Sequence, residues 1–342
     1  MNTERFHAIA IGFPQLRIGL VGDFFLDRYL HIDPAKAETS IETGLPVYNV
    51  VEVRSQPGAA GTILNNLVAL GIGEIHAVGF CGDDGAGYEL RRALASQPGV
   101  SLEHFITSPA RVTPVYCKPL VIEAGGPPRE LNRLDTKNWT PTPDDLEREL
   151  ADRVIDLAKH VDVLLVLDQV ELPETGVVTR RVREAARAAL MGKSSLLVLA
   201  DSRRGLHHFP ALGFKMNAAE LGRMTRLTGC DLEAVKSHAS QLAESTGQPV
   251  FVTLAECGIV GALPGKGTEH APAHAVRGPI DIVGAGDAVT ANLAAALAAG
   301  ADAREAMELA MAASSIVIHQ LGTTGTASVT QIAGLLMQRV DQ

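Results

Sequence analysis

The stretch DIVGAGDAVTANLAAALAAG, residues 281–300, sets two glycines and an aspartate directly against an alanine-rich run of helical character. The first backbone N–H groups of a helix have no partner within it and carry partial positive charge. Glycine leaves such groups open to a ligand because it has no Cβ. Gly284, Ala285 and Gly286 therefore predict a cradle for a phosphate or a developing oxyanion. Asp287 has two interpretations: a cap of the helix, or a base that takes a proton from an attacking hydroxyl.

Around this stretch, short apolar runs alternate with longer segments of helical periodicity. The alternation predicts an α/β fold of three layers, in which helices cover both faces of a mainly parallel sheet. Expected strands cover 16–23, 74–82, 161–168, 194–205 and 249–263, and expected helices cover 58–71, 86–96, 178–192 and 301–322. Ligands bind beyond the carboxyl ends of the strands in such sheets. The polar residues expected there are Asp23, Asp168, Asp201 and Asn217.

Two segments break this alternation, residues 31–56 and 107–134. Both are rich in Val, Thr and Pro and show alternating apolar residues, which predicts strands rather than helices. We expect them to form antiparallel strands inserted into the α/β body as a small β lid over the site. The chain is then predicted to be one domain over 1–342 with this insertion.

Composition limits the classes of partner. The chain has 342 residues, of which 46% are hydrophobic, and a net charge of −9, which argues against a nucleic-acid partner. No apolar run reaches the roughly 18 residues that a membrane span needs. Residues 1–10 lack the pattern of a signal peptide, and the four cysteines form no C-x-x-C pair. We expect a cytoplasmic protein that binds a small molecule.

Two further motifs bear on the chemistry. Asn217 and Glu220 form N-A-A-E where a short strand is expected to lead into a helix. Three residues apart, their side chains share one face of that helix, and their oxygens suit Mg²⁺ bound through water. The stretch PGAAGTILNN, residues 57–66, is a second glycine-rich turn that enters a helix.

In order and spacing, over nearly the whole chain, these motifs resemble the ribokinase-like pfkB family of carbohydrate kinases. The family's D-T-G-A-G-D signature corresponds to residues 281–287, its N-x-x-E motif to 217–220, and its T-L-x-x-x-G loop to 253–258. VGDFFLDRY over 21–29, together with the later LNRLD and HQLGTTGT segments, is most similar to the heptose 7-phosphate kinase branch.

The resemblance implies an ATP-dependent sugar kinase in which Asp287 is the catalytic base. The amides of Ala285, Gly286 and Asp287, in the turn that Gly284 begins, would form the anion hole for the transferring phosphoryl group.

The resemblance also implies a place for the cofactors, ATP and Mg²⁺. Asn217 and Glu220 would order Mg²⁺ and its waters against ATP. Thr253 and Gly258 would lie beside the nucleotide. A monovalent cation near Asp281 is a further expectation from the family.

On the acceptor side, the resemblance implies a sugar or sugar phosphate held by residues from several segments. The residues expected to bind it are Asp23, Asp27, Gly58, Thr62 and Arg203. The β lid would cover the sugar and, as in many relatives, form the interface of a homodimer.

Several positions depart from the family pattern. Val283 replaces the threonine of the signature, Thr62 replaces a sugar-binding asparagine, and residues 167–172 lack the tyrosine and lysine of the heptose branch. These departures leave open which sugar is bound and whether it arrives phosphorylated. They also leave open a non-catalytic descendant that only binds a sugar or nucleotide. A dinucleotide-dependent oxidoreductase is excluded, because no G-x-G-x-x-G follows the first strand.

Overall fold

The computed structural model describes residues 1–123, 126, 128–226, 231–322 and 324–337. Within these residues a ten-stranded sheet runs through the molecule in the order β17-β16-β15-β14-β13-β12-β1-β6-β7, with β8 paired to β6. Its strands are β1 (Arg17–Gly22), β6 (Glu74–Gly82), β7 (Val100–Ser101), β8 (Phe105–Ser108), β12 (Val163–Asp168), β13 (Leu197–Ser202), β14 (Gly213–Asn217), β15 (Val250–Thr253), β16 (Ile259–Leu263) and β17 (Gly267–Ala271). All neighbours from β7 to β15 pair in parallel, which confirms the predicted mainly parallel sheet.

The central strands are apolar along their whole length because both of their faces are covered. Every residue of β12 is buried, as are all residues of β1 after Arg17. A strand in an antiparallel sheet with one wet face would instead alternate apolar and polar residues. The continuous run VLLVLD in β12 is therefore what its central position requires.

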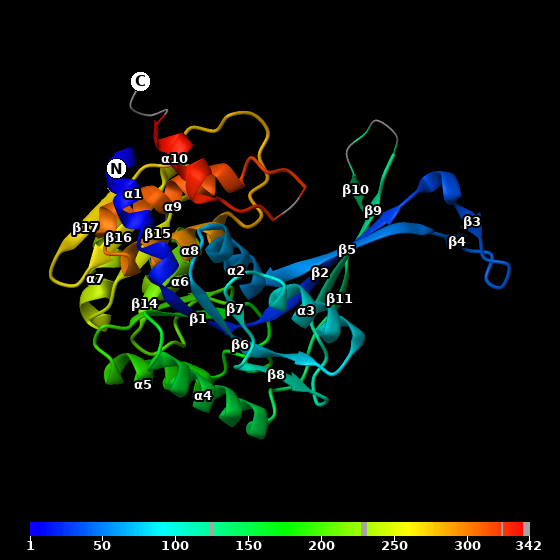
Figure 1. Cartoon of the computed structure of the whole chain (residues 1–342), viewed down its shortest axis with the longest axis horizontal. Coiled ribbons are helices and arrows are strands. Elements are labelled where there is room, and N and C mark those ends of the chain that lie inside the picture. The colour runs from blue at the N-terminus through cyan, green and yellow to red at the C-terminus, as the bar shows by residue number, and fades with distance from the viewer. Residues whose placement is uncertain (124–125, 127, 227–230, 323, 338–342) are drawn as a thin grey trace.

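Helices cover both faces of this sheet, as the three-layer prediction expected (Figure 1). One face packs against α1 (Thr3–Ala10), α2 (Ala60–Ala69), α3 (Gly85–Ala95), α8 (Ala285–Ala298), α9 (Ala303–Val317) and α10 (Val329–Met337). The other packs against α4 (Asp144–Ala158), α5 (Arg180–Gly192), α6 (Ala218–Thr225) and α7 (Leu232–Thr246). Helix α8 is buried at every residue from Ala288 to Ala296, so its small alanine side chains let neighbouring helices approach closely.

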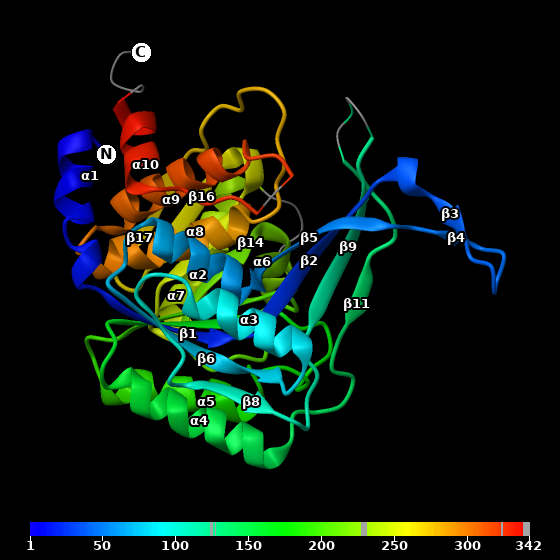
Figure 2. The ribbon, with the colours of Figure 1, turned by 45° about the vertical axis from the view of Figure 1, so that its right-hand side comes forward.

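A second sheet projects from the body of the molecule (Figure 2). It consists of β10 (Arg129–Glu130), β9 (Val115–Val121), β2 (Phe24–Ile32) and β5 (Val50–Ala59) in that order, with β11 (Leu134–Thr136) also paired to β9. A short hairpin of β3 (Glu38–Thr39) and β4 (Pro46–Val47) lies at its far end.

The second sheet differs from the expected lid in two respects. It begins at Phe24 and extends to Ala59, beyond the expected segment 31–56, and β2 pairs in parallel with β9 although antiparallel strands were expected. Strand β2 follows β1 after the single residue Asp23, directly beyond Gly22 at the end of β1. Residues 124, 125 and 127 of the expected segment 107–134 lie outside the described residues.

The order of the strands places the site. Strand β1 lies between β6, which follows it in the chain, and β12, which belongs to the later half. In open α/β sheets such a reversal of strand order marks the edge, beyond the carboxyl ends of the strands, at which ligands bind. Asp23 follows β1, and the ends of β12, β13 and β14 supply Asp168, Asp201 and Asn217 at the same edge. None of the described helices is both long enough and apolar enough to cross a membrane.

Candidate active site

The turn at residues 284–287 begins α8 and lies beside Lys215 of β14. Gly284 adopts φ +83°, and a Cβ there would lie 2.7 Å from Cγ2 of Thr324, so the turn requires glycine. The N–H groups of Gly286 and Asp287 meet no acceptor among the described residues. The N–H of Ala285 donates to the carbonyl oxygen of Ile282 at 3.2 Å. The expected cradle of three amides is therefore corrected to two open amides at the N-terminus of a fourteen-residue helix.

A buried ion pair lies beneath this turn. The Lys215 ammonium donates to Asp201 Oδ2 at 2.8 Å, and Thr290 Oγ1 donates to the same oxygen at 3.1 Å. A Cβ added to Gly286 would lie 3.2 Å from Lys215 Nζ, so the ammonium lies directly beside the cradle. Burial acts to lower the pKa of Lys215, but Asp201 and Asp287 outweigh it and raise the pKa. The ammonium therefore stays charged under the turn.

Lys215 was not among the residues expected from the sequence. The sequence feature that could have indicated Lys215 is its spacing to Asn217. Residues two apart on a strand point to the same side of the sheet. A lysine inside an otherwise apolar strand indicates a buried partner, and Asp201 is the second-last residue of the neighbouring strand.

Asp287 is half-buried, and its carboxylate receives no hydrogen bond from the residues that the structure describes. Burial, with a smaller contribution from the negative charge of Asp201, raises the pKa of Asp287 to about 7. Lys215 and Arg203 act in the opposite direction. A carboxylate with this pKa can accept a proton near neutral pH, as the predicted base must.

Asn217 and Glu220 are held differently from the expectation. Asn217 is the N-cap of α6 and not a residue on its face: its Oδ1 accepts from the Glu220 N–H at 2.9 Å. Glu220 Oε2 in turn accepts from the Asn217 N–H at 2.7 Å, which completes a capping box. One oxygen of each side chain is therefore used inside the protein. Burial raises the pKa of Glu220, and nearby Asp201 adds to the shift.

Thr253 and Gly258 lie at the same end of the sheet. Thr253 is in register with Asn217 on the neighbouring strand, and its Oγ1 donates to the Met216 carbonyl oxygen at 3.3 Å. Gly258 adopts φ +96°, and a Cβ there would lie 2.1 Å from the Ala271 carbonyl oxygen. The close approach that requires glycine at 258 is thus to protein backbone. That this loop also lies beside a bound nucleotide stays a prediction.

Four of the residues expected to bind the acceptor lie on the other side of the turn: Asp27, Gly58, Thr62 and Arg203. Asp27 is buried on β2, where a Cβ on Gly58 would lie 2.8 Å from its carboxyl carbon, and Lys118 Nζ lies 3.6 Å from Asp27 Oδ2. Burial raises the pKa of Asp27, against the opposing charges of Lys118 and Arg203. Thr62 Cγ2 would lie 3.7 Å from a Cβ on Gly284. The fold therefore brings these four predicted residues to the 284–287 turn.

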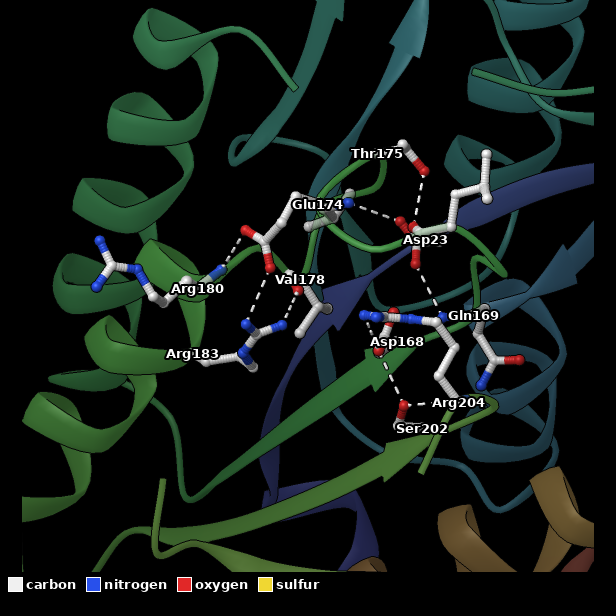
Figure 3. Close-up of polar contacts among 12 residues, drawn as sticks. Asp23, Asp168, Gln169, Glu174, Thr175, Val178, Arg180, Arg183, Ser202 and Arg204 are labelled. Carbon is white, nitrogen blue, oxygen red and sulfur yellow. Dashed lines mark hydrogen bonds and ion pairs between the residues drawn. The ribbon is translucent and has the colours of Figure 1, made fainter. Parts of the chain in front are cut away.

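Asp23 is used inside the protein (Figure 3). Its Oδ2 accepts from the Gln169 N–H at 2.9 Å and its Oδ1 from the Val177 N–H at 2.7 Å. Beside it, Asp168 Oδ2 accepts from Arg204 at 2.7 Å and from Ser202 at 2.8 Å. Asp23 thus ties the loop after β12 to the end of β1. That it also binds sugar hydroxyls stays a prediction.

The motif spacing and this geometry agree with a comparison to known families. The sequence pattern described as pfkB family carbohydrate kinase matches residues 29–330 of this chain. The chain belongs to the pfkB family of carbohydrate kinases. The match begins within β2 and extends past the turn at 284–287.

Curated relatives within this family support the resemblance to the heptose branch. Two proteins named bifunctional protein HldE, from Hyphomonas neptunium and Nitrobacter hamburgensis, are each 31% identical to this chain. The alignments cover 94% and 91% of this chain but 63% and 61% of the relatives. This chain spans about three fifths of their length.

Solved structures confirm the ribokinase-like fold. Ribokinase from Arabidopsis thaliana, complexed with ribose and ATP, superposes with a TM-score of 0.67 at 19% identity, covering 94% of this chain and 98% of that one. Phosphofructokinase-2 from Escherichia coli, in complex with substrates and products, gives a TM-score of 0.71 at 18% identity, covering 94% and 99%. At these identities the likeness concerns the fold alone.

Proposed function

We propose that this chain is an ATP-dependent sugar kinase that transfers the γ-phosphoryl group of ATP to a hydroxyl of a sugar or sugar phosphate. The observation that carries the proposal is the Asp287 carboxylate, which is unpaired among the described residues and stands beside two open amides and the Lys215 ammonium. A binding protein needs no base at that point, and a carboxylate there repels a bound phosphate. The repulsion is useful only where the carboxylate accepts a proton from the attacking hydroxyl.

The residues present fit ATP with Mg²⁺. Open amides at a helix N-terminus and a buried ammonium are donors suited to phosphate oxygens. Mg²⁺ keeps several of its waters and uses few protein ligands, so the capping box of Asn217 and Glu220 leaves enough oxygen for contact through water. Thr253, in register with Asn217, and Gly258 would border the nucleotide on that side. Bound Mg²⁺ would neutralise charge that develops on the phosphates.

Different residues of the chain then have different roles in the proposed phosphoryl transfer. Asp287 takes the proton of the attacking hydroxyl, and the amides of Gly286 and Asp287 stabilise the charge on the transferring phosphoryl oxygens. Lys215 holds positive charge below these amides. Asp27 accepts a hydrogen bond from a sugar hydroxyl, and Arg203, whose charge acts on both Asp27 and Asp287, lies between acceptor and cradle.

The second sheet is proposed to close over the acceptor and to join two copies of the chain. Its outer part exposes Val51 at 51%, Val53 at 57% and Leu134 at 63%, and the hairpin beyond exposes Ile41 fully. Apolar side chains gathered on a projecting sheet indicate an interface. Sedimentation of the purified chain as a monomer at micromolar concentration would contradict the dimer. The single domain over 1–342, the monovalent cation near Asp281 and the cytoplasmic location remain predictions.

The test of the activity is release of ADP from ATP and Mg²⁺ in the presence of a panel of acceptors. The panel includes heptose 7-phosphate, fructose phosphates, ribose and adenosine. We expect one class of acceptor to raise ADP release far above the background without acceptor. Binding of sugar or nucleotide without ADP release from any acceptor would favour the alternative, a non-catalytic descendant.

A further inference from the structure

A cavity of about 30 Å³ lies between the base of the second sheet, the segment 137–139 and the loop after β12. We call it the side cavity. Its walls are mostly aromatic or aliphatic: Phe24, Phe25, Phe80, Pro114, Tyr116, Trp139, Val170, Leu172 and Val177. A single water needs roughly 10–15 Å³, so the side cavity has space for a group of a few atoms.

The side cavity opens next to the proposed acceptor residues. Tyr116 on β9 is in register with Asp27 on β2, so the two side chains lie on one face of the second sheet. Phe25 is two residues before Asp27 on the same face, and its ring meets Tyr116 edge-on at 5.0 Å. Arg203 Nη1 donates to the Tyr116 hydroxyl at 3.3 Å. An acceptor held by Asp27 and Arg203 therefore has the side cavity as its neighbour.

The charged groups that line the side cavity already have partners. Lys137 Nζ lies 2.8 Å from Glu171 Oε2 and 3.4 Å from Asp135 Oδ2. Both oxygens of Asp23 accept backbone N–H groups. Lys137 is the one cation among the lining residues, and it has two carboxylates. Arg133 and Arg203, which are not among the lining residues, contact the Tyr116 side chain. A phosphate placed in the side cavity itself would meet a mostly apolar wall, which is costly, whereas an apolar group gains from leaving water.

We propose that the side cavity receives an uncharged, methyl-sized group of the acceptor, such as the C6 methyl of a 6-deoxy sugar. The inference rests on the proposed function, because it names the class of sugar that the kinase site takes. The acceptor end that enters the side cavity carries no phosphate.

Trp139 provides a direct reporter. It is the only tryptophan of the chain, it lines the side cavity, and 70% of it is exposed. The whole chain is titrated with sugars that differ only at C6: glucose, 6-deoxyglucose and glucose 6-phosphate, and the three corresponding mannose compounds. In at least one series we expect the 6-deoxy sugar to change Trp139 emission with a dissociation constant about threefold or more below that of the hydroxylated parent. The phosphate is expected to bind at least about tenfold more weakly than the 6-deoxy sugar.

Tighter binding of the phosphates, equal binding of all three sugars, or no response to either 6-deoxy sugar overturns the proposal. The variant Glu171→Gln sharpens the test, because Glu171 is exposed and its loss leaves Lys137 with one carboxylate fewer. We expect the preference for 6-deoxy sugar over phosphate to fall at least threefold in this variant, and an unchanged preference contradicts the charge argument.

The two proposals can fail separately. Binding of the 6-deoxy sugar without ADP release would contradict the proposed kinase activity and support the side cavity as a sugar-binding element. ADP release with the sugar phosphates only would support the kinase activity and contradict the assignment of the side cavity.

Discussion

Two aspartates at the same edge of the sheet, Asp23 and Asp287, share most of their electrostatics and differ in one respect. Burial raises the pKa of each to about 7, and each has a second acid nearby, Asp168 for Asp23 and Asp201 for Asp287. Each of the two carboxylate oxygens of Asp23 accepts a hydrogen bond from one backbone N–H group. Asp287 accepts none from the described part of the chain.

The difference teaches that a raised pKa does not by itself identify a base. A carboxylate whose two oxygens each accept a backbone N–H holds a loop in place, whatever its pKa. A carboxylate with the same pKa and free oxygens can take a proton from a ligand. The variants below separate these two uses of one side chain.

The largest expected effect comes from Asp287→Asn. Removing the base should lower kcat for ADP release by about 10²–10⁴-fold, because an amide cannot accept the proton. ATP affinity and the melting temperature should stay close to the wild-type values, since the carboxylate makes no hydrogen bond within the described residues and its loss relieves a buried charge. Initial rates, calorimetric titration with ATP and thermal melts measure the three quantities. A wild-type kcat in this variant would remove Asp287 as the base.

The pH dependence of the rate should report the same group. With a pKa of about 7, Asp287 is mostly protonated at pH 6 and mostly ionised at pH 8. The value of kcat/KM should therefore fall about tenfold per pH unit below 7 and level off above it. The profile is measured with the best acceptor at constant ionic strength. A flat profile from pH 5 to 8 would show that no group with this pKa must be ionised for catalysis.

Asp23→Asn should act on stability instead of the chemical step. Asparagine can accept one of the two amide N–H groups, but its own NH₂ faces the other, so the free energy of unfolding should fall by about 1–3 kcal/mol. Urea denaturation measures it. The pKa of Asp23 is raised from 3.8 to about 7 on folding, so its contribution to stability is fully present below about pH 4 and is lost as pH rises toward 7.

The sign of that dependence provides the control. The stability difference between wild type and Asp23→Asn should shrink as pH rises from 4 to 7, because only the wild type pays the cost of ionising residue 23. The kcat of the folded variant should change far less than that of Asp287→Asn. A loss of kcat as large as that of Asp287→Asn, at unchanged stability, would indicate that Asp23 acts in the acceptor site.

Much of the fold was predictable from the sequence because it depends on local patterns. The apolar runs of β12 and β13 and the helical periodicity of α5 and α9 lie where they were expected, within a few residues. The second sheet was less predictable. Its strand β2 begins one residue after β1 ends, so no loop separates the two strands in the sequence. Its parallel pairing with β9 depends on contacts between segments about 90 residues apart.

The turn of the candidate site was predictable where backbone conformation determines the residue type, as at Gly284. The role of Asp287 as the base stays a prediction. The site was less predictable where a side chain has two possible partners. Motif spacing alone could not show that Asp23 faces two backbone amides, or that Asn217 and Glu220 cap each other. It also missed Lys215, whose partner Asp201 lies fourteen residues earlier on another strand.

The smallest expected effect is that of Val283→Thr, which restores the hydroxyl that the family signature carries at this position. Val283 is 54% exposed, and its N–H already donates to Asp281 Oδ1 at 3.0 Å. If the amides of Gly286 and Asp287 stabilise the transferring group, an added hydroxyl should change kcat by less than about threefold and the free energy of unfolding by less than about 0.5 kcal/mol.

Gly286→Ala is the matched comparison, because its Cβ would lie 3.2 Å from Lys215 Nζ and narrow the cradle itself. Its kcat should fall about tenfold or more. A rise of more than tenfold in Val283→Thr, with no loss in Gly286→Ala, would show that a side-chain hydroxyl and not the open amides limits this turn, and the contrast between Asp287 and Asp23 would then need a different explanation.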